Sequence, residues 1–360
     1  MLWKNENWNS EKRNWIVTIA LTCLGLACAC LLAICFFMRK PADSDALKIK
    51  VLILPKFEVG EMTGDFPGEA QLYFDEYVRG GQEYVIAGVP ESCKLYVKDG
   101  VALYLTGMSK VDSSLNTAML LSDERFDFSD AYVLSTGCAG SAVGYGVMGD
   151  VFVLSATVDY DLGHHADPRE MKQEKDVTWF HENDHDAISV VKLNADLIDR
   201  VYELVKDVKL ETTEKTRKYM RETFPSESWA DREPKVLRGT GVTGDNFWKG
   251  KYDHANALAK VAAYDCADPF ATTEMEDIAI TKVIQRFGLL DRYIILRDSV
   301  NIDIFMNGDS PESIWDTSFE ERATEDEQGE ALDIFETAME NNFRVGKVII
   351  DKILSGGMAH

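Results

Sequence analysis

Three polar stretches of the chain carry side chains that could do chemistry, and each follows a segment that is predicted to be a buried strand. The stretch STGCAG at 135–140 is rich in small residues, and further glycines follow it. The stretch EMED at 274–277 places three carboxylates at the start of a predicted helix, and RDSVN at 297–301 follows the apolar run RYIIL. Because open α/β sheets bind ligands beyond the carboxyl ends of their strands, all three stretches are candidates for a ligand site.

Each stretch also has an ordinary structural explanation. Glycines after a strand bring backbone N–H groups close to a ligand, but they also form tight turns. A carboxylate in a first helical turn could accept hydrogen bonds from a sugar diol, or it could interact only with the helix dipole. The polar residues of RDSVN could read the edge of a base or form a plain loop. No single stretch therefore identifies a function.

The elements that must position these stretches alternate along the chain. Apolar, β-branched runs predict strands at 47–54, 101–106, 131–135, 150–158 and 292–296. Apolar residues at helical spacing predict helices at 113–121, 193–205, 276–287 and 348–354. Strands that alternate with helices favour an α/β fold, in which a mainly parallel sheet is covered on both faces. The acidic stretch 319–330 is expected to be a solvated loop or helix face.

Composition excludes several classes of function. The 360 residues carry a formal net charge of -23, and no basic stripe offsets it, so nucleic acid is not an expected partner. Hydrophobic residues make up 46% of the chain, which is enough for a sizeable core. Cys93, Cys138 and Cys266 are odd in number and far apart, so they predict neither a disulfide framework nor a CxxC metal pair.

The N-terminal region reads as a membrane segment. After a tail at 1–14, residues Trp15–Met38 form an uncharged apolar run that is long enough to cross a bilayer. A polar linker at 39–46 then leads to one domain at 47–360. The run is longer than a typical signal-peptide core, so a retained anchor is favoured over a cleaved signal or a buried helix. With an anchor or a cleaved signal, the domain is expected to lie outside the cytoplasm.

In combination, the order of the motifs resembles a known superfamily. LTGMSKV at 105–111 precedes a helix, STGCAG and a strand come next, and GDNF at 244–247, the EMED helix and LRDSVN follow. This order is similar to that of nucleosidases and purine nucleoside phosphorylases, and most similar to the purine nucleoside permease family. The resemblance covers about residues 47–307, with a poorly matched insertion in the middle. It implies a nucleoside phosphorylase-like single domain with a mixed central sheet flanked by helices.

The resemblance also implies roles for individual residues. Glu276 would bind the ribose hydroxyls, Met275 would line the sugar, and Phe247 would stack on the purine. Small residues would bring the backbone close to the ligand; these are Gly107, Ser109, Gly137 and Ala139. Glu58, in PKFEVG after the first strand, falls where nucleosidases keep a carboxylate that orients the attacking water.

At Asn301 the sequence departs from the pattern of the family. Nucleosidases and many phosphorylases keep an aspartate here, which protonates the leaving purine. An asparagine amide can donate to purine O6 or N7, but it has no titratable proton and cannot act as a general acid. Asn301 is therefore expected to contact the base in the catalytic site without protonating it.

Two histidine pairs are further candidates for contacts. His181 and His185 in HENDHD are four residues apart, which suits one helical face, but no third ligand is apparent. A solvated loop is therefore favoured there, and no metal is expected. His164 and His165 lie where the resemblance places the border of the sugar site, but an ordinary loop is favoured over a ligand contact there.

The sequence thus predicts a membrane-tethered protein that binds a purine nucleoside and cleaves or transfers its N-glycosidic bond. No arginine can be assigned to a phosphate site, so hydrolysis is favoured, with phosphate as a possible co-substrate and no other cofactor. Two alternatives stay open: a nucleoside-binding component of transmembrane transport without catalysis, and an inactive surface domain. One helix cannot enclose a polar solute, so the chain alone is not expected to form a channel. A homo-oligomer is possible.

Overall fold

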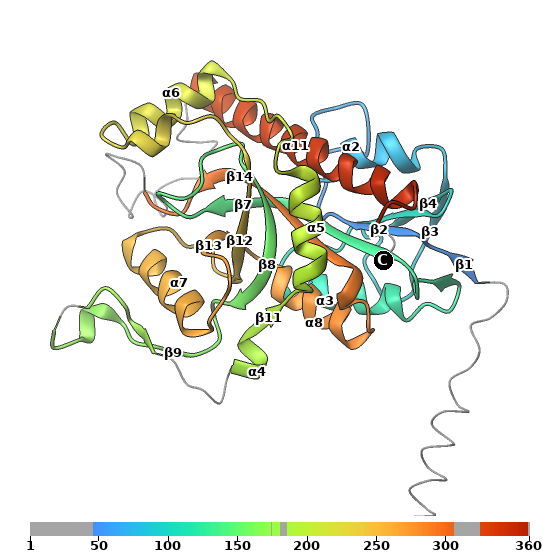
Figure 1. The fold of residues 1–360 in the computed structure, drawn as a ribbon, viewed down its shortest axis with the longest axis horizontal. Helices are drawn as coiled ribbons and strands as arrows, with labels where there is room; N and C mark the ends of the chain where they lie inside the picture. The colour runs from blue at the N-terminus through green and yellow to red at the C-terminus, as the bar shows by residue number, and fades with distance from the viewer. Residues whose placement is uncertain (1–45, 174, 181–185, 306–324, 359–360) are drawn as a thin grey trace, which may run out of the picture. The chain divides into compact units, whose positions relative to one another are not determined.

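The computed structural model of the chain describes residues 46–173, 175–180, 186–305 and 325–358 (Figure 1). Residues Leu47–His360 form one compact unit. The predicted membrane segment Trp15–Met38 lies outside the described residues, and so do His181 and His185. No helix among the residues that are described has both the length and the apolar character needed to cross a membrane.

A mixed β-sheet forms the centre of this unit, and part of it closes on itself. The strands of the described residues pair in the order β11 (Val190–Lys192), β8 (Val151–Asp159), β12 (Val236–Thr243), β13 (Phe270–Glu274), β7 (Tyr132–Ser141), β2 (Val51–Leu54), β5 (Val101–Tyr104), β4 (Leu95–Lys98) and β3 (Gln82–Tyr84). A further strand, β14 (Tyr293–Ile302), runs parallel to β7 and antiparallel to β8. Since β8 also pairs with β12, and β13 pairs with both β12 and β7, these five strands form a closed ring.

Helices flank the sheet on both sides. The longer ones are α3 (Lys110–Leu121), α5 (Ala195–Val205), α6 (Glu214–Thr223), α7 (Lys251–Ala263), α8 (Asp277–Arg286) and α11 (Glu325–Leu354). Short helical turns are α2 (Gln71–Tyr73), η1 (Phe74–Val78), η2 (Pro168–Glu170), α4 (Asp186–Ser189), η4 (Ser228–Asp231) and η5 (Leu290–Arg292), and short strand pairs are β1 (Leu47–Lys48) with β6 (Phe126–Asp127) and β9 (His164–His165) with β10 (Trp179–Phe180). In Figure 1, α11 crosses one side of the sheet, while α3 and α8 pack together on the opposite side.

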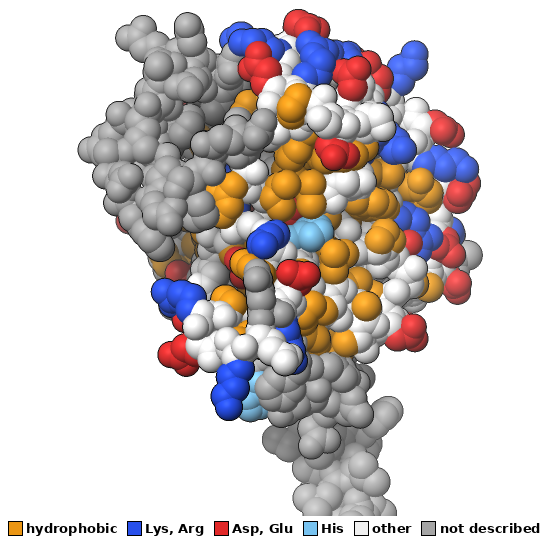
Figure 2. Space-filling model, turned by 90° about the vertical axis from the view of Figure 1, so that its left-hand side faces the viewer, with side chains coloured by type: hydrophobic (Ala, Val, Ile, Leu, Met, Phe, Trp, Pro, Cys, Tyr) orange, Lys and Arg blue, Asp and Glu red, His pale blue; other side chains and the backbone are white. Residues whose placement is uncertain are grey.

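One large apolar core holds the sheet and the helices together. All of β2 and the first four residues of β14 are buried, as expected for strands that are covered on both faces. A second, smaller cluster includes Tyr160, Trp179 and Phe270 and packs against Ala257 and Val261 of α7. Figure 2 views the molecule from the end at which α7 lies and shows apolar side chains gathered on that surface.

The predicted α/β class with a mixed sheet and flanking helices is confirmed, but two strands are longer than predicted. Strand β7 continues through STGCAG, for which the sequence favoured a turn, and β14 continues through RDSVN, which the sequence placed after the strand as a base-reading cluster or a plain loop. They continue because they pair with each other in parallel, Arg297 opposite Gly137 and Asn301 opposite Gly140. The sheet contains more antiparallel pairs than predicted. Two of them close the ring: β13 is antiparallel to β7, and β14 is antiparallel to β8.

Two further elements differ from the prediction. The run 47–54 is divided into β1 and β2, because residues Leu47 and Lys48 pair with β6 instead of with the main sheet. The C-terminal helix, predicted at 348–354, begins at Glu325 and therefore includes the end of the acidic stretch 319–330. Gly346 lies within this helix, and the Tyr73 ring occupies the space that a side chain there would need.

Candidate nucleoside site

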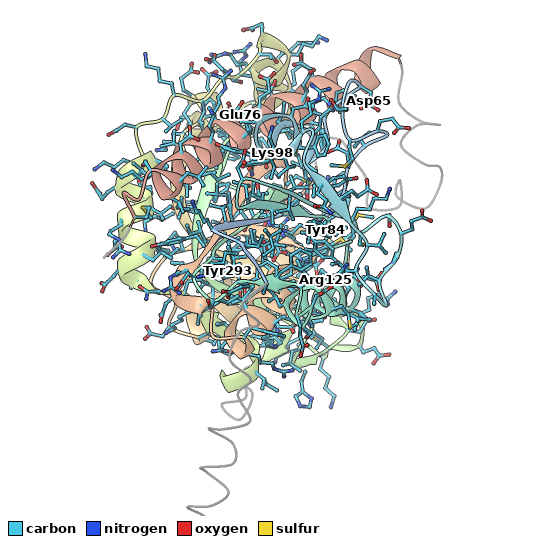
Figure 3. All side chains as sticks on the ribbon, turned by 90° about the vertical axis from the view of Figure 1, so that its right-hand side faces the viewer. Asp65, Glu76, Tyr84, Lys98, Arg125 and Tyr293 are labelled. Carbon is cyan, nitrogen blue, oxygen red and sulfur yellow. The ribbon has the colours of Figure 1, made fainter. Side chains whose placement is uncertain are left out.

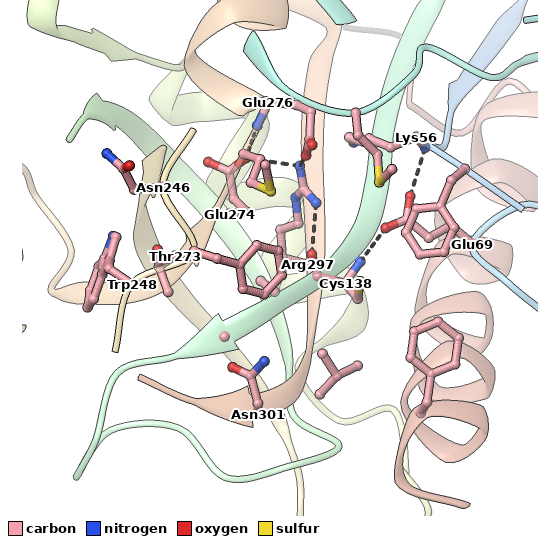
Figure 4. Close-up of a pocket in the computed structure, with 18 of the residues that line it drawn as sticks. Lys56, Glu69, Cys138, Asn246, Trp248, Thr273, Glu274, Glu276, Arg297 and Asn301 are labelled. Atoms are coloured by element: carbon pink, nitrogen blue, oxygen red, sulfur yellow. Dashed lines mark hydrogen bonds and ion pairs between the residues drawn. The ribbon is translucent and has the colours of Figure 1, made fainter. Parts of the chain in front are cut away.

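A cavity of about 320 Å³ opens where β7, β13 and β14 end (Figure 4). This volume lies at the lower end of the range for small-molecule sites, about 300–1,000 Å³. Apolar and aromatic side chains alternate with charged ones around it. The lining residues are Lys56, Phe57, Glu69, Met108, Cys138, Ala139, Gly140, Asn246, Phe247, Trp248, Lys249, Thr273, Glu274, Met275, Glu276, Arg297, Val300, Asn301 and Phe335.

Arg297 lies at the floor of the cavity and is bonded on every side. Its guanidinium donates to Asp277 Oδ1 at 2.8 Å and Oδ2 at 2.9 Å, to Glu274 Oε2 and Glu276 Oε2 at 3.1 Å, and to the carbonyl oxygen of Cys138 at 2.9 Å. The Arg297 side chain is only 1% exposed, so its hydrogen bonds are made with the protein instead of with bulk water. A buried charge is tolerated only with such pairing, and here it draws three carboxylates to one point.

Glu274 organises the start of helix α8. Its Oε2 accepts hydrogen bonds from the backbone N–H groups of Glu276 at 2.6 Å and Asp277 at 2.7 Å, which are otherwise unpaired at a helix start. Its Oε1 accepts from the hydroxyl of Thr243. Burial, together with the charge of Asp277, raises the pKa of Glu274 to about 8, although Arg297 opposes the change. The structural role that a carboxylate has at a helix start thus belongs to Glu274, which leaves Glu276 available at the cavity.

The Glu276 carboxylate is held from two sides. Arg297 donates to Oε2, and the backbone N–H of Ser109 donates to Oε1 at 3.1 Å. Ser109 has a φ of 72° and a ψ of 160°, a conformation that normally requires glycine. This strained backbone aims the N–H of Ser109 at Glu276. Gly107 also precedes helix α3, and its N–H donates to the carbonyl oxygen of Lys56 at 3.0 Å.

Glu69 is a third carboxylate that lines the cavity, in addition to Glu274 and Glu276. It accepts from the backbone N–H of Lys56 at 2.7 Å and from that of Cys138 at 2.9 Å (Figure 4). Gly137 makes room for it, because a Cβ there would stand 2.5 Å from Glu69 Oε1. Burial raises the pKa of the Glu69 carboxyl, while the charges of Lys56 and Arg297 lower it. Gly137 thus acts through Glu69, and Gly137 itself is not one of the lining residues.

Glu58 lies outside the set of lining residues. Its carboxylate caps the turn before α2, where it accepts from the backbone N–H groups of Gly68, Ala70 and Gln71. Burial raises the pKa of Glu58, and these hydrogen bonds lower it. A carboxylate that is committed to four backbone donors, including its neighbour Val59, is not oriented toward a ligand. Its catalytic role stays a prediction, and the cavity offers Glu69 instead.

Lys56 is the second buried cation. It is 2% exposed, and its Nζ donates to Ser135 Oγ at 2.7 Å and to the carbonyl oxygens of Thr136 at 2.8 Å and Leu54 at 3.2 Å. Burial and the neighbouring Arg297 lower the pKa of Lys56, and carboxylates that include Asp277 oppose this change. All three protons of the ammonium group are therefore bound by the protein.

The wall opposite this charged floor is aromatic and carries amides. The loop between β12 and α7 contributes Asn246, Phe247 and Trp248, and the Phe247 side chain is 83% exposed. Asn301 projects from β14 over Gly140, where a Cβ would stand 2.5 Å from its Oδ1. No described residue forms a hydrogen bond with the Asn301 side-chain amide, which leaves its donors and acceptor available to a ligand.

The structure brings together five of the nine predicted site residues at the cavity: Ala139, Phe247, Met275, Glu276 and Asn301. The other four do not line it. Ser109 holds the lining residue Glu276, and Gly137 makes room for the lining residue Glu69, whereas Gly107 and Glu58 do neither. His165 also lies outside the lining, with its ring Nε2 3.3 Å from the carbonyl oxygen of Tyr160. Burial raises the pKa of the Cys138 thiol well above its usual value, so this lining cysteine is not an activated nucleophile.

Sequence reasoning missed Lys56, Glu69 and Arg297. Lys56 and Arg297 stood within quoted motifs, but only the ring of strands shows that both point into one buried cluster. Glu69 is separated from the first strand by the loop 55–68, so spacing from that strand gave no signal.

Several solved structures with the same fold are nucleosidases. A 5′-methylthioadenosine/S-adenosylhomocysteine nucleosidase from Colwellia psychrerythraea, in complex with adenine, superimposes with a TM-score of 0.51, at 18% identity over 86% of this chain and 97% of that chain. The enzyme from Helicobacter pylori, as an aspartate-to-asparagine mutant with 5′-methylthioadenosine in the active site, gives 0.52, at 15% identity over 85% of this chain and 100% of that chain. The chain therefore has a nucleosidase-like α/β fold.

The sequence also identifies the family of this chain, which is a more specific class than its fold. The family model described as purine nucleoside permease matches residues 48–357, and the chain belongs to this family. A probable purine nucleoside permease of Schizosaccharomyces pombe is 27% identical over 222 residues, which are 55% of this chain and 63% of that protein. The match thus spans less than two thirds of the length of this relative.

Proposed function

We propose that the cavity binds a purine nucleoside, with the ribose at Met275 and Glu276 and the base between Phe247 and Asn301. The observation that carries this proposal is the arrangement around one cavity of a fixed carboxylate, an exposed aromatic ring and an amide that no described residue bonds. A carboxylate bonds the two hydroxyls of a diol, an aromatic ring stacks on a purine, and an amide pairs with the edge of the base. The nucleosidases of the same fold bind adenine and 5′-methylthioadenosine, which agrees with this class of ligand.

We further propose that the protein hydrolyses the N-glycosidic bond. Glu69 is the base: its carboxylate takes a proton from a water molecule as the water oxygen bonds to the ribosyl carbon. The purine leaves with the electron pair of the glycosidic bond and takes a proton from solvent, because the Asn301 amide cannot supply one. Positive charge develops on the sugar in this step. The Glu276 carboxylate, which Arg297 and the Ser109 N–H hold at the proposed sugar position, would stabilise this charge.

Water is favoured over phosphate as the nucleophile. Phosphorolysis needs a cation whose donors are available to the anion. Of the two cations at the cavity floor, Arg297 donates to Glu274, Glu276, Asp277 and the carbonyl oxygen of Cys138, and Lys56 donates to one hydroxyl and two carbonyl groups. A phosphate at the cavity floor would also meet the carboxylates. Phosphate therefore stays the less favoured co-substrate.

A binding component of nucleoside transport, without catalysis, is the second candidate. The observation that favours it is Asn301, whose amide cannot protonate the departing purine. The family name agrees with this function. In either case we propose that the segment 15–38 tethers the domain to a membrane, outside the cytoplasm.

Incubation of the purified protein with inosine, adenosine or guanosine, with and without phosphate, tests these proposals. Release of free base without phosphate is the result expected. Release that depends on phosphate would identify a phosphorylase. Saturable binding of an intact nucleoside would support the transport component, and no binding at all would overturn the assignment of the site.

A further inference from the structure

A cluster of charges lies behind the loop 244–248, outside the lining of the cavity. Lys110, the first residue of α3, places its Nζ 2.5 Å from Asp161 Oδ2 and 3.1 Å from Asp159 Oδ1. These side chains are only 18%, 25% and 12% exposed, respectively. Neither the nucleoside contacts nor the proposed reaction uses this cluster.

Asp161 joins the cluster to the loop that carries Phe247. Its Oδ2 accepts from the backbone N–H of Asp245 at 2.8 Å, and its Oδ1 accepts from Asn246 Nδ2 at 3.0 Å. In return, the backbone N–H of Lys110 donates to Asp245 Oδ1 at 2.8 Å. Asp245 and Asn246, the two residues before Phe247, are therefore fixed by hydrogen bonds to Asp161 and Lys110.

The same cluster reaches the opposite wall of the cavity. Lys110 directly follows Ser109, whose N–H holds the Glu276 carboxylate. Asp161 and Lys110 thus connect the aromatic loop to the strained turn that orients the sugar carboxylate. On its other side the loop is fixed by Trp248, which stacks on Tyr160 at a centroid distance of 5.0 Å.

Phe247 itself contributes little to its own position. Because its side chain is 83% exposed, core packing does not hold the ring, and the backbone of the loop decides where it stands. Isolated ion pairs at a surface stabilise proteins weakly, but several donors that converge on one partly buried carboxylate form a stronger network. Although burial opposes it, these hydrogen bonds keep the pKa of Asp161 below its usual value.

We propose that Asp161, together with Lys110, is a positioning residue for base recognition: it holds the loop 244–248 so that Phe247 stands over the purine. This inference rests on the proposed function, since it assigns Asp161 a share in binding the nucleoside. It acts through Phe247 and makes no contact with the ligand.

A double-mutant cycle tests the coupling, with inosine as the ligand and calorimetry as the readout. Asp161→Asn should weaken binding about three- to tenfold, the upper value corresponding to about 1.4 kcal/mol. In a Phe247→Ala background the same change should weaken binding no further. Lys110→Met should resemble Asp161→Asn, and Lys110→Arg should restore affinity. Equal weakening by Asp161→Asn in both backgrounds would overturn the proposal.

Lys347→Met is the matched control. Lys347, on α11, also bridges two carboxylates, Glu76 and Asp351, and it is not one of the residues that line the cavity. Glu76 is labelled in Figure 3. The Lys347→Met variant should leave inosine binding unchanged. If it weakened binding as much as Lys110→Met does, general destabilisation would explain the effect, and the proposal would be overturned.

Hydrogen exchange of the loop amides separates this inference from the proposed function. If the wild-type protein binds no inosine, the proposed function fails, yet the anchoring can still be measured. Amides of residues 245–248 should exchange faster in Asp161→Asn than in wild type, while those of β12 stay unchanged. Equal exchange in the loop would show that Asp161 does not position it.

Discussion

Phe247 is the residue at which binding can be tested with little effect on folding. Its ring is 83% exposed, so Phe247→Ala removes almost no buried surface. If the ring stacks on the purine, nucleoside affinity should fall by about 1–3 kcal/mol, the range for loss of a base stack. Isothermal calorimetry measures this change.

Phe287→Ala supplies the control for that change. Phe287 ends helix α8, is 41% exposed and does not line the cavity. Its removal should leave nucleoside affinity unaltered. Unchanged affinity in a folded Phe247→Ala protein would remove Phe247 from the site.

Asn301 decides both base preference and rate in the proposed reaction. Its Oδ1 lies over Gly140, so Nδ2 is the group that can face the base. In this orientation it can donate to the O6 of inosine and guanosine, whereas it would meet the 6-amino group of adenosine donor to donor. An unpaired buried donor costs about 1–3 kcal/mol, so the preference should be about tenfold or greater. Asn301→Asp should shift preference toward adenosine and raise any cleavage rate by about 10²–10⁴-fold, because it supplies a general acid.

Initial rates and dissociation constants for inosine and adenosine, measured side by side, test this prediction. Asn301→Ser is a useful companion, since it removes the amide without adding an acid. It should lose the base preference and gain no rate. A wild-type profile in Asn301→Asp would mean that this residue does not meet the base.

At the scale of elements, the parallel pair β7–β14 builds the site. Two glycines of β7 each leave space for one functional side chain: Gly137 for Glu69, and Gly140 for Asn301. A methyl group at either position would stand 2.5 Å from an oxygen of that side chain. Because the paired backbone of β7 and β14 is fixed, the Glu69 or Asn301 side chain would have to move.

These two glycines give separable predictions. Gly137→Ala should displace Glu69 and reduce cleavage by about 10²-fold or more, the usual contribution of a general base, while base preference stays. Gly140→Ala should alter the preference between inosine and adenosine and affect cleavage less. Steady-state kinetics with both nucleosides distinguishes the two. Loss of cleavage in both variants, with the same melting temperature as wild type, would contradict separate roles.

The sequence predicted the elements better than their contacts. The apolar runs of β2 and β14 and the helical spacing of α5 and α8 depend on local pattern, and the predicted strands and helices occur there. The polar ends of β7 and β14 resemble turns, and only pairing within the ring makes them strands. Among the site residues, the resemblance pointed to Met275 and Glu276 in the short EMED motif, and both line the cavity. Glu69 depends on a loop that returns to the cavity, and short-range spacing does not encode that path.

At the scale of the whole molecule, the site is a buried group of charges within an acidic protein. The chain carries a net charge of -23, and more carboxylates than cations meet around Arg297. Repulsion between buried carboxylates is reduced when some of them keep their protons. Consistently, burial raises the pKa values of Glu69, Glu274 and Asp298. The fold that gathers these carboxylates therefore also makes stability depend on pH.

Glu274 allows this dependence to be measured. Its folded-state pKa is raised to about 8, while an unfolded glutamate titrates near pH 4.3, so between these values the folded state holds a proton that the unfolded state has lost. The free energy of unfolding should therefore fall as the pH rises from about 5 to about 8. Glu274→Gln mimics the protonated form and should flatten this decline, as measured by urea denaturation at several pH values.

Asp167→Asn controls for the loss of a carboxylate as such. Hydrogen bonds from Arg169 lower the pKa of the exposed Asp167 to about 2, and a lowered pKa changes stability only at acidic pH. Between pH 5 and pH 8 this variant should therefore keep the wild-type slope. A wild-type slope in Glu274→Gln as well would show that Glu274 stays ionised beside Arg297, with the excess proton held by Glu69 or Asp298 instead. The proposed base would then need a higher pH to act, which ties the stability profile of the molecule to the chemistry of its site.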